Sequence, residues 1–212
     1  MSSGTLRQGL AALGFGSAAE LLEHFLAELE RWNARFGFVK ATADELVAKH
    51  VLDSIAAAPV IAGLCTGGGV LDVGSGAGFP GIPLAIALPG VRFSLLERSA
   101  KKCAFLENSR ALLGLGNVRV LQADLAAASG RFDVVTFRAV APLERFFREL
   151  SRSAVAWGAV AAYKGRRDRV DAELEAIGAA ARGAEVVRLE VPFMEEERHL
   201  VVVRNPVNRL GS

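Results

Sequence analysis

The sequence predicts an α/β fold in which a helical extension precedes a mostly parallel, seven-stranded sheet. Up to about residue 62, apolar side chains recur at three- and four-residue spacing, which is the periodicity of a helix. From residue 70 onward, short β-rich runs alternate with helical segments, which is typical of a parallel sheet covered on both faces. The 212 residues, 51% of them hydrophobic, suffice to bury such a core without a disulfide or a metal. We therefore expect a helical extension over 1–62 and a sheet domain over 63–212.

Two helices are expected in the extension. Ser17 with Glu20, and Thr42 with Glu45, each match the capping box, in which side chains satisfy the first free N–H groups of a helix. The first helix follows Ser17 and carries an apolar stripe to Trp32, and the second runs from about residue 44 to 57. The stripe predicts that the first helix packs against the core.

The expected strands span 70–73, 93–97, 118–122, 132–137, 158–164, 185–191 and 199–204. Helices are expected after Pro80, Ser99, Pro142 and Arg167, in the gaps between strands. Because no helical segment separates the final two strands, an antiparallel last strand is expected.

A glycine-rich turn, DVGSGAGFPG, directly follows the first strand and predicts a cofactor at the mouth of the sheet. Its glycines permit a tight turn and a close approach of a ligand to the backbone: Gly74, Gly76 and Gly78. Asp72 would repel a pyrophosphate but attract the ammonium or sulfonium of S-adenosylmethionine. Pro80 removes one N–H group that a phosphate would use. The turn therefore favours a cationic donor over a dinucleotide.

Two acidic residues follow the next strands and complete the cofactor prediction. Glu97 ends the second strand, where its carboxylate can accept hydrogen bonds from both ribose hydroxyls. Asp124 follows the third strand, where it can accept from the adenine amine, with Leu125 and Ala126 beside the adenine; its alternative role is a turn or a helix cap. Together with the turn, these positions predict a Rossmann-like, class I S-adenosylmethionine-dependent methyltransferase domain. A nicotinamide-dependent oxidoreductase stays open, because the turn also fits a loose G-x-G-x-x-G and the spacing to Glu97 suits either cofactor.

Arg138 is the leading catalytic candidate, because it ends the fourth strand, which opens toward the donor methyl. Its guanidinium fork can hold a carboxylate, a phosphate or guanine O6. The alternative is an arginine that only pairs with Asp133 or Glu144.

A second group of basic residues is predicted to contact RNA phosphates. It lies beyond the fourth and fifth strands and comprises Arg145, Arg148, Lys164, Arg166 and Arg167, with Arg169 nearby. Phe146 or Phe147 could stack on a base, although such pairs are more often core. The alternative for these residues is a set of solvated helix faces.

Several runs together resemble the bacterial 16S ribosomal RNA guanine-N7 methyltransferase family, also called the glucose-inhibited division protein B family. They are RWNARF, HVLDSI, VLDVGSGAGFPGIPLAIALP, TFRAVAPL and YKG, and the likeness covers about residues 20–204. The resemblance implies methyl transfer from S-adenosylmethionine to guanine N7 in 16S ribosomal RNA. It implies donor contacts by Gly74, Phe79, Glu97, Arg98, Ser99, Leu125, Ala126 and Arg138. The loop from Gly37 to Val39 departs from the family pattern.

The chemistry agrees with this resemblance. Guanine N7 has an in-plane lone pair and no proton, so methylation there needs alignment and charge management rather than a general base. Methylation at cytosine C5 needs a cysteine nucleophile, but neither Cys65 nor Cys103 lies in a proline-flanked loop. Ribose 2′-O methylation needs a lysine, and Lys164, the second catalytic candidate, keeps that reaction open. A small-molecule O-methyltransferase also stays open. A non-catalytic RNA-binding protein is a further alternative.

The remaining expectations concern location and partners. The N-terminal apolar run is short and interrupted by glycines, and prolines cut the most hydrophobic segment, so we expect neither a signal peptide nor a membrane span. We expect a cytoplasmic monomer that binds 16S ribosomal RNA or the small ribosomal subunit and holds no metal. His50, beside Asp53 and Ser54, is expected to have a structural or substrate-lid role, because residues so close on one helix cannot form a hydrolase triad.

Overall fold

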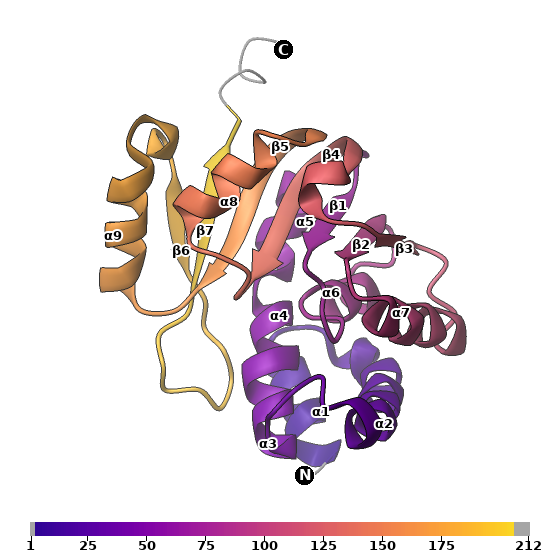
Figure 1. The fold of residues 1–212 in the computed structure, drawn as a ribbon. Helices are drawn as coiled ribbons and strands as arrows, with labels where there is room; N and C mark the ends of the chain where they lie inside the picture. The colour runs from indigo at the N-terminus through magenta and orange to yellow at the C-terminus, as the bar shows by residue number, and fades with distance from the viewer. Residues whose placement is uncertain (1–2, 206–212) are drawn as a thin grey trace.

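The computed structural model describes residues 3–205 and contains a central seven-stranded sheet with helices on both faces (Figure 1). The strands are β1 (Val70–Val73), β2 (Phe93–Glu97), β3 (Val118–Gln122), β4 (Ser129–Arg138), β5 (Ala154–Lys164), β6 (Glu185–Arg188) and β7 (His199–Arg204). They lie in the order β3-β2-β1-β4-β5-β7-β6. Strands β1 to β5 pair in parallel, and β7 is antiparallel to both of its neighbours. The predicted sheet and its antiparallel last strand are confirmed.

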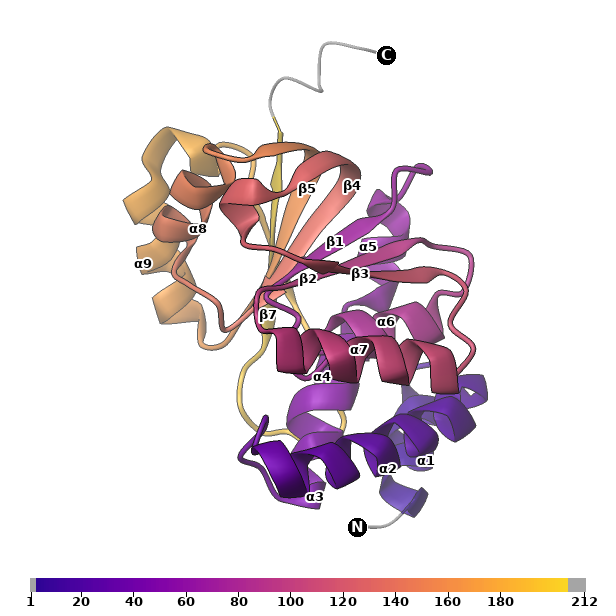
Figure 2. The ribbon, with the colours of Figure 1, turned by 45° about the vertical axis from the view of Figure 1, so that its right-hand side comes forward.

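Helices connect the parallel strands where the sequence predicts them (Figure 2). They are α6 (Gly81–Ala87), α7 (Ala100–Leu112), α8 (Leu143–Leu150) and α9 (Arg167–Ile177), with short 3₁₀ turns at Leu125–Ala127 and Gly178–Ala181. Strands β4 and β5 begin earlier than predicted because their first residues continue to pair with each other. Strand β6 ends earlier than predicted, at Arg188, because its partner β7 begins opposite that residue.

Because successive side chains of a strand point to opposite faces, the sheet separates two hydrophobic clusters. Side chains such as Val70 and Leu95 point toward one face, which the N-terminal helices, α6 and α7 cover. Side chains such as Leu71 and Val135 point toward the other face, which α8 and α9 cover. The helical extension shares the first cluster with the sheet, so the two predicted units have a common core. The boundary at residue 62 stays a prediction. The outer ends of the two predicted units, 1–62 and 63–212, lie outside the described residues.

The N-terminal extension contains more helix than the sequence predicts. Its elements are α1 (Ser3–Ala12), a 3₁₀ turn (Gly16–Ala18), α2 (Ala19–Phe36), α3 (Ala43–Glu45), the π-helical segment η2 (Leu46–Leu52), α4 (Asp53–Ala56) and α5 (Ala58–Leu64). Helices α1 and α5 were not expected. The Thr42 capping box is confirmed, with the side chain of Glu45 bonded back to the Thr42 N–H. The Ser17 capping box is wrong, because Ser17 lies inside the 3₁₀ turn and α2 begins after Ala18.

The second predicted helix contains the π-helical segment η2. The N–H group of Asp53 donates to the carbonyl of Ala48, five residues earlier, instead of four as in an α-helix. Such segments often occur at functional sites. By length and composition the whole run Ala43–Leu64 could cross a membrane, and half of its most apolar window is buried inside the fold.

The loop that departs from the family pattern is held by local contacts. The side chain of Asn33 accepts from the Val39 N–H at 2.8 Å and donates to the Val39 carbonyl at 2.8 Å. Gly37 ends α2 in the left-handed conformation, and Phe38 stacks on Phe36 with ring centroids 5.6 Å apart. The altered sequence therefore forms a defined loop.

Candidate active site

The residues predicted to bind the donor gather at the carboxyl edge of β1, β2 and β3. The turn Gly74–Pro80 follows β1, Glu97 is the last residue of β2, and Asp124 follows β3. Because these three strands are adjacent and parallel, their carboxyl ends meet at one edge of the sheet. Ligands of open α/β sheets bind outside such strand ends.

The glycine turn presents backbone without side chains. Gly74, Gly76 and Gly78 have φ angles of 69°, 59° and 91°, which other residues rarely adopt. A Cβ atom at Gly74 would lie 2.8 Å from Cγ2 of Val140, and one at Gly78 would lie 2.9 Å from Cγ1 of Ile82. The turn is therefore a backbone cradle that a side chain at either position would fill.

Glu97 is buried and holds this cradle in place. Its Oε2 accepts from the Gly76 N–H at 3.0 Å, and its Oε1 accepts from the Ser99 N–H at 2.8 Å. Each carboxylate oxygen has a second lone pair, so these bonds leave acceptor capacity for ribose hydroxyls. The carboxylate thus links the turn after β1 to the residue that precedes α7.

Asp72 is fully buried beneath the turn. Its Oδ2 accepts from the Gly81 N–H at 3.1 Å, whereas Oδ1 has no hydrogen-bond partner. Burial raises the pKa of Asp72 to about 7, against the hydrogen bonds that favour its charged form. Such an unpartnered, buried carboxylate oxygen favours a cationic ligand nearby. Asp72 exposes no surface for direct contact, so its predicted role is an electrostatic one.

The other predicted donor contacts differ in exposure. Arg98, Asp124 and Ala126 are exposed, Ser99 is half-buried, and Leu125 is buried in the core that α8 covers. All of them follow β2 or β3 and lie at the same edge as the turn. Their contacts with a donor stay predictions.

Phe79 connects the turn to a second group of residues at the end of β4. Its buried ring packs against the rings of Phe25 and His50, with centroids 5.5 and 5.1 Å away. The guanidinium of Arg138 lies over the same ring, with Cζ 5.4 Å from the centroid. The predicted donor turn and the predicted catalytic arginine are therefore in contact.

Arg138 is held by the N-terminal extension. Its Nη1 donates to the Lys49 carbonyl at 2.7 Å and to Asp53 Oδ2 at 3.2 Å, and its Nη2 donates to His50 Nδ1 at 2.6 Å. Its side chain is 15% exposed. The alternative in which Arg138 pairs with Asp133 or Glu144 is wrong.

His50 is neutral in this arrangement. Burial and the Arg138 guanidinium lower its pKa to about 4, because both disfavour a second positive charge. Nδ1 therefore accepts the Arg138 N–H, and the ring proton resides on Nε2. The sequence places His50 and Asp53 one helical turn apart, but it gives no sign that both face Arg138.

Asp53 joins the extension to two arginines from different parts of the sheet domain. Its buried carboxylate pairs with Arg138 and, at 3.6 Å, with Nε of Arg198 from the loop before β7. Burial raises the pKa of Asp53, while the two arginines counteract this shift. Beside it, the hydroxyl of Tyr163 donates to the Ser54 carbonyl at 2.7 Å. Arg198 was missed because no motif marks its loop.

A cavity of about 700 Å³ opens beside Arg138. Its charged lining residues are Lys49, Asp53, Arg138, Lys164, Arg166, Arg169, Glu173, Glu196 and Arg198. Six of these carry a positive charge and three a negative one, so the cavity is cationic. Its position at the ends of β4 and β5 places it next to the glycine turn through Phe79. The cavity suits an anionic or polyanionic acceptor.

Lys164 has contacts that the sequence did not predict. Its Nζ pairs with Glu173 Oε2 at 2.6 Å, donates to the Ala141 carbonyl at 3.3 Å, and lies 5.4 Å from the Phe137 ring centroid. The side chain is only 11% exposed. These contacts argue against a direct phosphate contact or a catalytic proton transfer by Lys164 in this structure, because its charge is already neutralised.

The other predicted RNA-binding arginines are exposed, and each is paired within its own helix or helix start. The pairs are Arg145 with Glu149, Arg148 with Glu144, Arg166 with Asp168 and Arg167 with Asp171. Phe146 is buried and stacks on Phe137 with centroids 3.7 Å apart, so it belongs to the core. RNA contact by these arginines stays a prediction.

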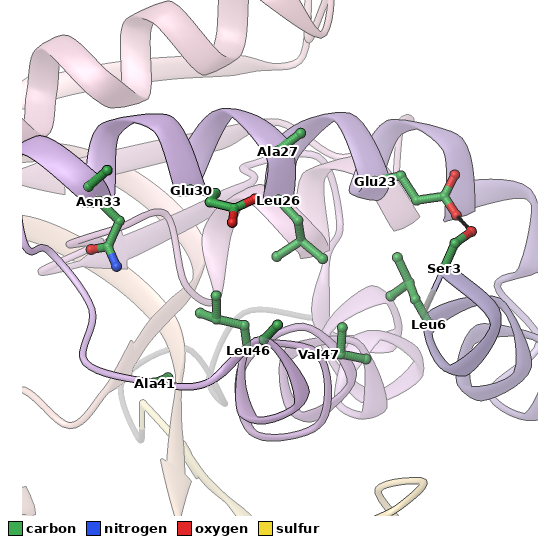
Figure 3. A pocket seen from close by; sticks show the side chains of 12 residues that line it. Ser3, Leu6, Glu23, Leu26, Ala27, Glu30, Asn33, Ala41, Leu46 and Val47 are labelled. Atoms are coloured by element: carbon green, nitrogen blue, oxygen red, sulfur yellow. Dashed lines mark hydrogen bonds between the residues drawn. The ribbon is translucent and has the colours of Figure 1, made fainter. Parts of the chain in front are cut away.

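A further cavity, of about 560 Å³, lies between α1, α2 and the start of η2 (Figure 3). Apolar side chains such as Leu6, Leu26 and Leu46 line it, together with Glu23 and Glu30. Arg7 pairs with Glu23 at 2.5 Å. Its acidic lining does not suit a phosphate. Within residues 3–205, no group of His, Cys, Asp and Glu side chains has the arrangement of a metal site.

Comparison with known proteins gives one consistent result. The family described as "GidB: rRNA small subunit methyltransferase G" matches residues 18–201. Proteins named ribosomal RNA small subunit methyltransferase G are similar over nearly the whole chain. One from Stenotrophomonas maltophilia is 38% identical over 95% of this chain and 94% of its own length, and one from Treponema denticola is 33% identical over 97% and 96%.

Solved structures agree on the fold. A human methyltransferase 10 domain-containing protein superposes with a TM-score of 0.57 at 11% identity, covering 87% of this chain and 97% of the other. A magnesium protoporphyrin IX methyltransferase from Synechocystis, solved with bound S-adenosylmethionine, gives 0.53 at 20% identity, covering 83% and 90%. The predicted class I methyltransferase fold is therefore confirmed.

Proposed function

The chain belongs to the GidB family of rRNA small subunit methyltransferases, and from this premise we propose that it transfers the methyl group of S-adenosylmethionine to N7 of a guanine in 16S ribosomal RNA. The resemblance predicted from the sequence motifs is confirmed. The observation that carries the proposal is the position of Arg138, between the glycine turn and the cationic cavity. A donor at the turn and an RNA acceptor in the cavity would meet at this residue.

The donor side fits a cationic nucleoside. S-adenosylmethionine supplies an electrophilic methyl group when it is bound. Glu97 has spare acceptor capacity for hydroxyls beside a turn without side chains, and Asp72 keeps an unpartnered carboxylate oxygen beneath it. A buried carboxylate with a raised pKa becomes easier to ionise when a positive charge binds nearby. A pyrophosphate would meet the opposite effect, which disfavours a dinucleotide.

The acceptor side needs orientation rather than proton transfer. Guanine N7 carries no proton, so the chain needs no general base. His50, which is neutral and accepts from Arg138, serves to hold the guanidinium. A bidentate arginine contact to guanine uses both O6 and N7. Because N7 must stay free to react, we infer that Arg138 contacts O6 alone or a phosphate.

The structure also bears on the alternatives. A ribose 2′-O-methyltransferase would need Lys164 to lower the pKa of the hydroxyl, but Lys164 is bound to Glu173. A small-molecule methyltransferase has less use for a cavity in which cations outnumber anions two to one. A nicotinamide-dependent oxidoreductase is inconsistent with the family.

The test is transfer of radiolabelled methyl from S-adenosylmethionine to naked 16S RNA, assembled small subunits and a metabolite extract, all from cells that lack this activity. We expect label in RNA, recovered as N7-methylguanine after nuclease digestion. Label at a ribose or in the metabolites would overturn the proposal. The two RNA arms also determine whether the substrate is the naked or the assembled RNA.

We also propose that the protein acts as a cytoplasmic monomer. The cavity, Arg138 and its partners all come from one chain, so the site is complete without a second copy. Light scattering during gel filtration should give a mass near 22.4 kDa. A mass of twice that value at micromolar concentration would contradict the monomer.

A further inference from the structure

A third cavity, of about 320 Å³, lies at the edge of the sheet opposite to the glycine turn. Residues at or just before the starts of β2, β3 and β4 line it, including Arg92, Arg119 and Arg131. Arg92, just before β2, lies five residues from Glu97 at the other end of the strand, which corresponds to about 16 Å at roughly 3.3 Å per residue. The cavity is thus distinct from the donor and acceptor sites.

Two of the three arginines are held in place by neutral groups. Arg119 Nε donates to Ser94 Oγ at 2.7 Å, and its Cζ lies 6.0 Å from the Phe132 ring centroid. Arg92 donates to the carbonyl of Gly67. Neither contact neutralises a guanidinium, and each restricts its side chain. The cavity therefore has oriented donors whose charge is uncompensated.

No ion pair engages these arginines among residues 3–205, in contrast to four arginines in or next to α8 and α9, each of which has a carboxylate partner within 4 Å: Arg145, Arg148, Arg166 and Arg167. The carboxylate behind Gly68 belongs to Asp133, and it is already bonded to the N–H groups of Thr66, Gly68 and Gly69. Even with Asp133 counted, three positive charges face one negative charge. Oriented guanidiniums with an excess of positive charge are suited to phosphate.

We propose that the sheet-edge cleft formed by Arg92, Arg119 and Arg131 binds backbone phosphates of the ribosomal RNA substrate, at a distance from the methylated guanine. This inference rests on the proposed function and adds a second contact region to it. The cleft offers uncompensated cations, whereas Arg145, Arg148, Arg166 and Arg167 first have to give up a carboxylate. The contact is independent of base identity, because phosphates carry no sequence information. It anchors a part of the RNA beyond the reacting nucleotide.

The test compares R92A/R119A/R131A with a control of equal charge, R31A/R110A/R188A, whose arginines are paired with Glu28, Glu107 and Glu190. For the first variant we expect KM for small subunits to rise about 10-fold, kcat to change less than twofold, and thermal stabilisation by S-adenosylmethionine to persist. The slope of log K for naked 16S RNA against log salt should fall by about 2, since each lost phosphate contact removes about 0.7–0.9. Arg131→Glu alone, at an exposed side chain, should show the same direction if the triple variant folds poorly.

Equal KM values and salt slopes for the cleft variant and the control would overturn the proposal. So would a raised KM for subunits with an unchanged slope on naked RNA, which would indicate that the cleft meets a ribosomal protein. These outcomes differ from a failure of the proposed function, in which the wild-type protein itself labels no RNA. The cleft and the reaction are therefore tested separately.

Discussion

The donor edge and the Arg138 site are built in opposite ways. At the donor edge, contacts are local and made to the backbone: Asp72 bonds Gly81 nine residues later, and Glu97 bonds Gly76 from 21 residues away. At the Arg138 site, the side chain of Arg138 bonds to residues of the N-terminal extension that lie 85 to 89 positions earlier in the sequence. The donor edge follows from a sequence motif, whereas the Arg138 site forms only when the N-terminal extension packs on the sheet domain.

This difference separates the two binding functions. Disturbing the extension should loosen Arg138 and affect the glycine turn less, because the hydrogen bonds of the turn come from β1, β2 and α6 and the extension reaches it through packing on Phe79. Disturbing the turn should impair donor binding directly. Each substitution below affects one side of this comparison and leaves the other side as its internal control.

The largest effect is expected for Arg138→Ala. It removes the group that faces the cationic cavity, so kcat/KM for methyl transfer should fall about 10²- to 10³-fold, as when one preorganised donor is lost. The dissociation constant for S-adenosylmethionine should change less than threefold. Arg188→Ala, at an exposed residue paired with Glu190, is the matched control.

The same variant should also be less stable, because Asp53 loses one of its two cationic partners. Breaking a buried ion pair typically costs about 3–5 kcal/mol, and Arg198 should keep the loss at the lower end. Arg138→Ala/Asp53→Asn should recover part of it, measured by denaturant unfolding. A double variant no more stable than Arg138→Ala would contradict the assigned network.

Asp72→Asn tests the donor side, with an expected loss of about 10-fold in S-adenosylmethionine affinity at pH 8. The pKa of Asp72 is about 7 in the fold and 3.8 ordinarily. The charged form is therefore disfavoured by folding, and wild-type stability is penalised progressively as the pH rises from about 4 through 7. Asp72→Asn should thus be the more stable protein at pH 8, by up to roughly 4 kcal/mol, and this advantage should vanish toward pH 4.

Isothermal titration from pH 6 to 8.5 measures the effect on affinity, and thermal unfolding from pH 4 to 8.5 measures the effect on stability. Wild-type affinity should weaken below pH 7 as Asp72 takes up a proton, whereas the affinity of the variant should stay constant. Equal affinities for the two proteins at pH 8 would show that the Asp72 charge does not contribute to donor binding.

His50→Gln should have a smaller effect, about fivefold in kcat, because glutamine keeps an acceptor for Arg138 but not the ring packing on Phe79. The pKa of His50 is lowered from 6.5 to about 4. Folding therefore favours the neutral ring, and the wild type loses this stability as the pH falls from 6.5 through 4. The stability difference between wild type and His50→Gln should shrink over that interval. A ring that titrates near 6.5 by NMR would contradict the Arg138 contact.

The comparison also explains what the sequence could predict. The positions of the strands along the chain, the starts of four helices and the glycine turn follow from period, capping and turn chemistry, which act over a few residues. Arg138 was placed correctly at the end of β4, but its partners could not be predicted, because no local rule relates residue 138 to residues 49–53. The burial of Lys164 against Glu173 was missed for a related reason: it depends on how α9 packs beside β5.

The π-helical segment shows a different limit. Its sequence has the periodicity of an ordinary helix, and the prediction of a helix there was right in kind. The shift to hydrogen bonds that span five residues occurs where Val47, Val51 and Leu52 are buried against the rest of the fold. Neither propensity nor spacing marks such a shift, although it determines which side chains reach the sheet.

The smallest effect concerns the caps of the extension, where local chemistry and packing can be compared directly. Thr42→Ala removes a capping box that the structure contains, and should cost about 1 kcal/mol in the free energy of unfolding. Ser17→Ala, which removes the same motif in sequence, should cost almost nothing, because Ser17 makes no such cap. Since Thr42 begins the run that carries His50, its loss should also lower kcat slightly without changing S-adenosylmethionine affinity. Equal destabilisation by the two substitutions, measured by urea unfolding, would mean that the cap at Ser17 forms after all, and that the extension is built more by its own sequence than by the sheet it packs on.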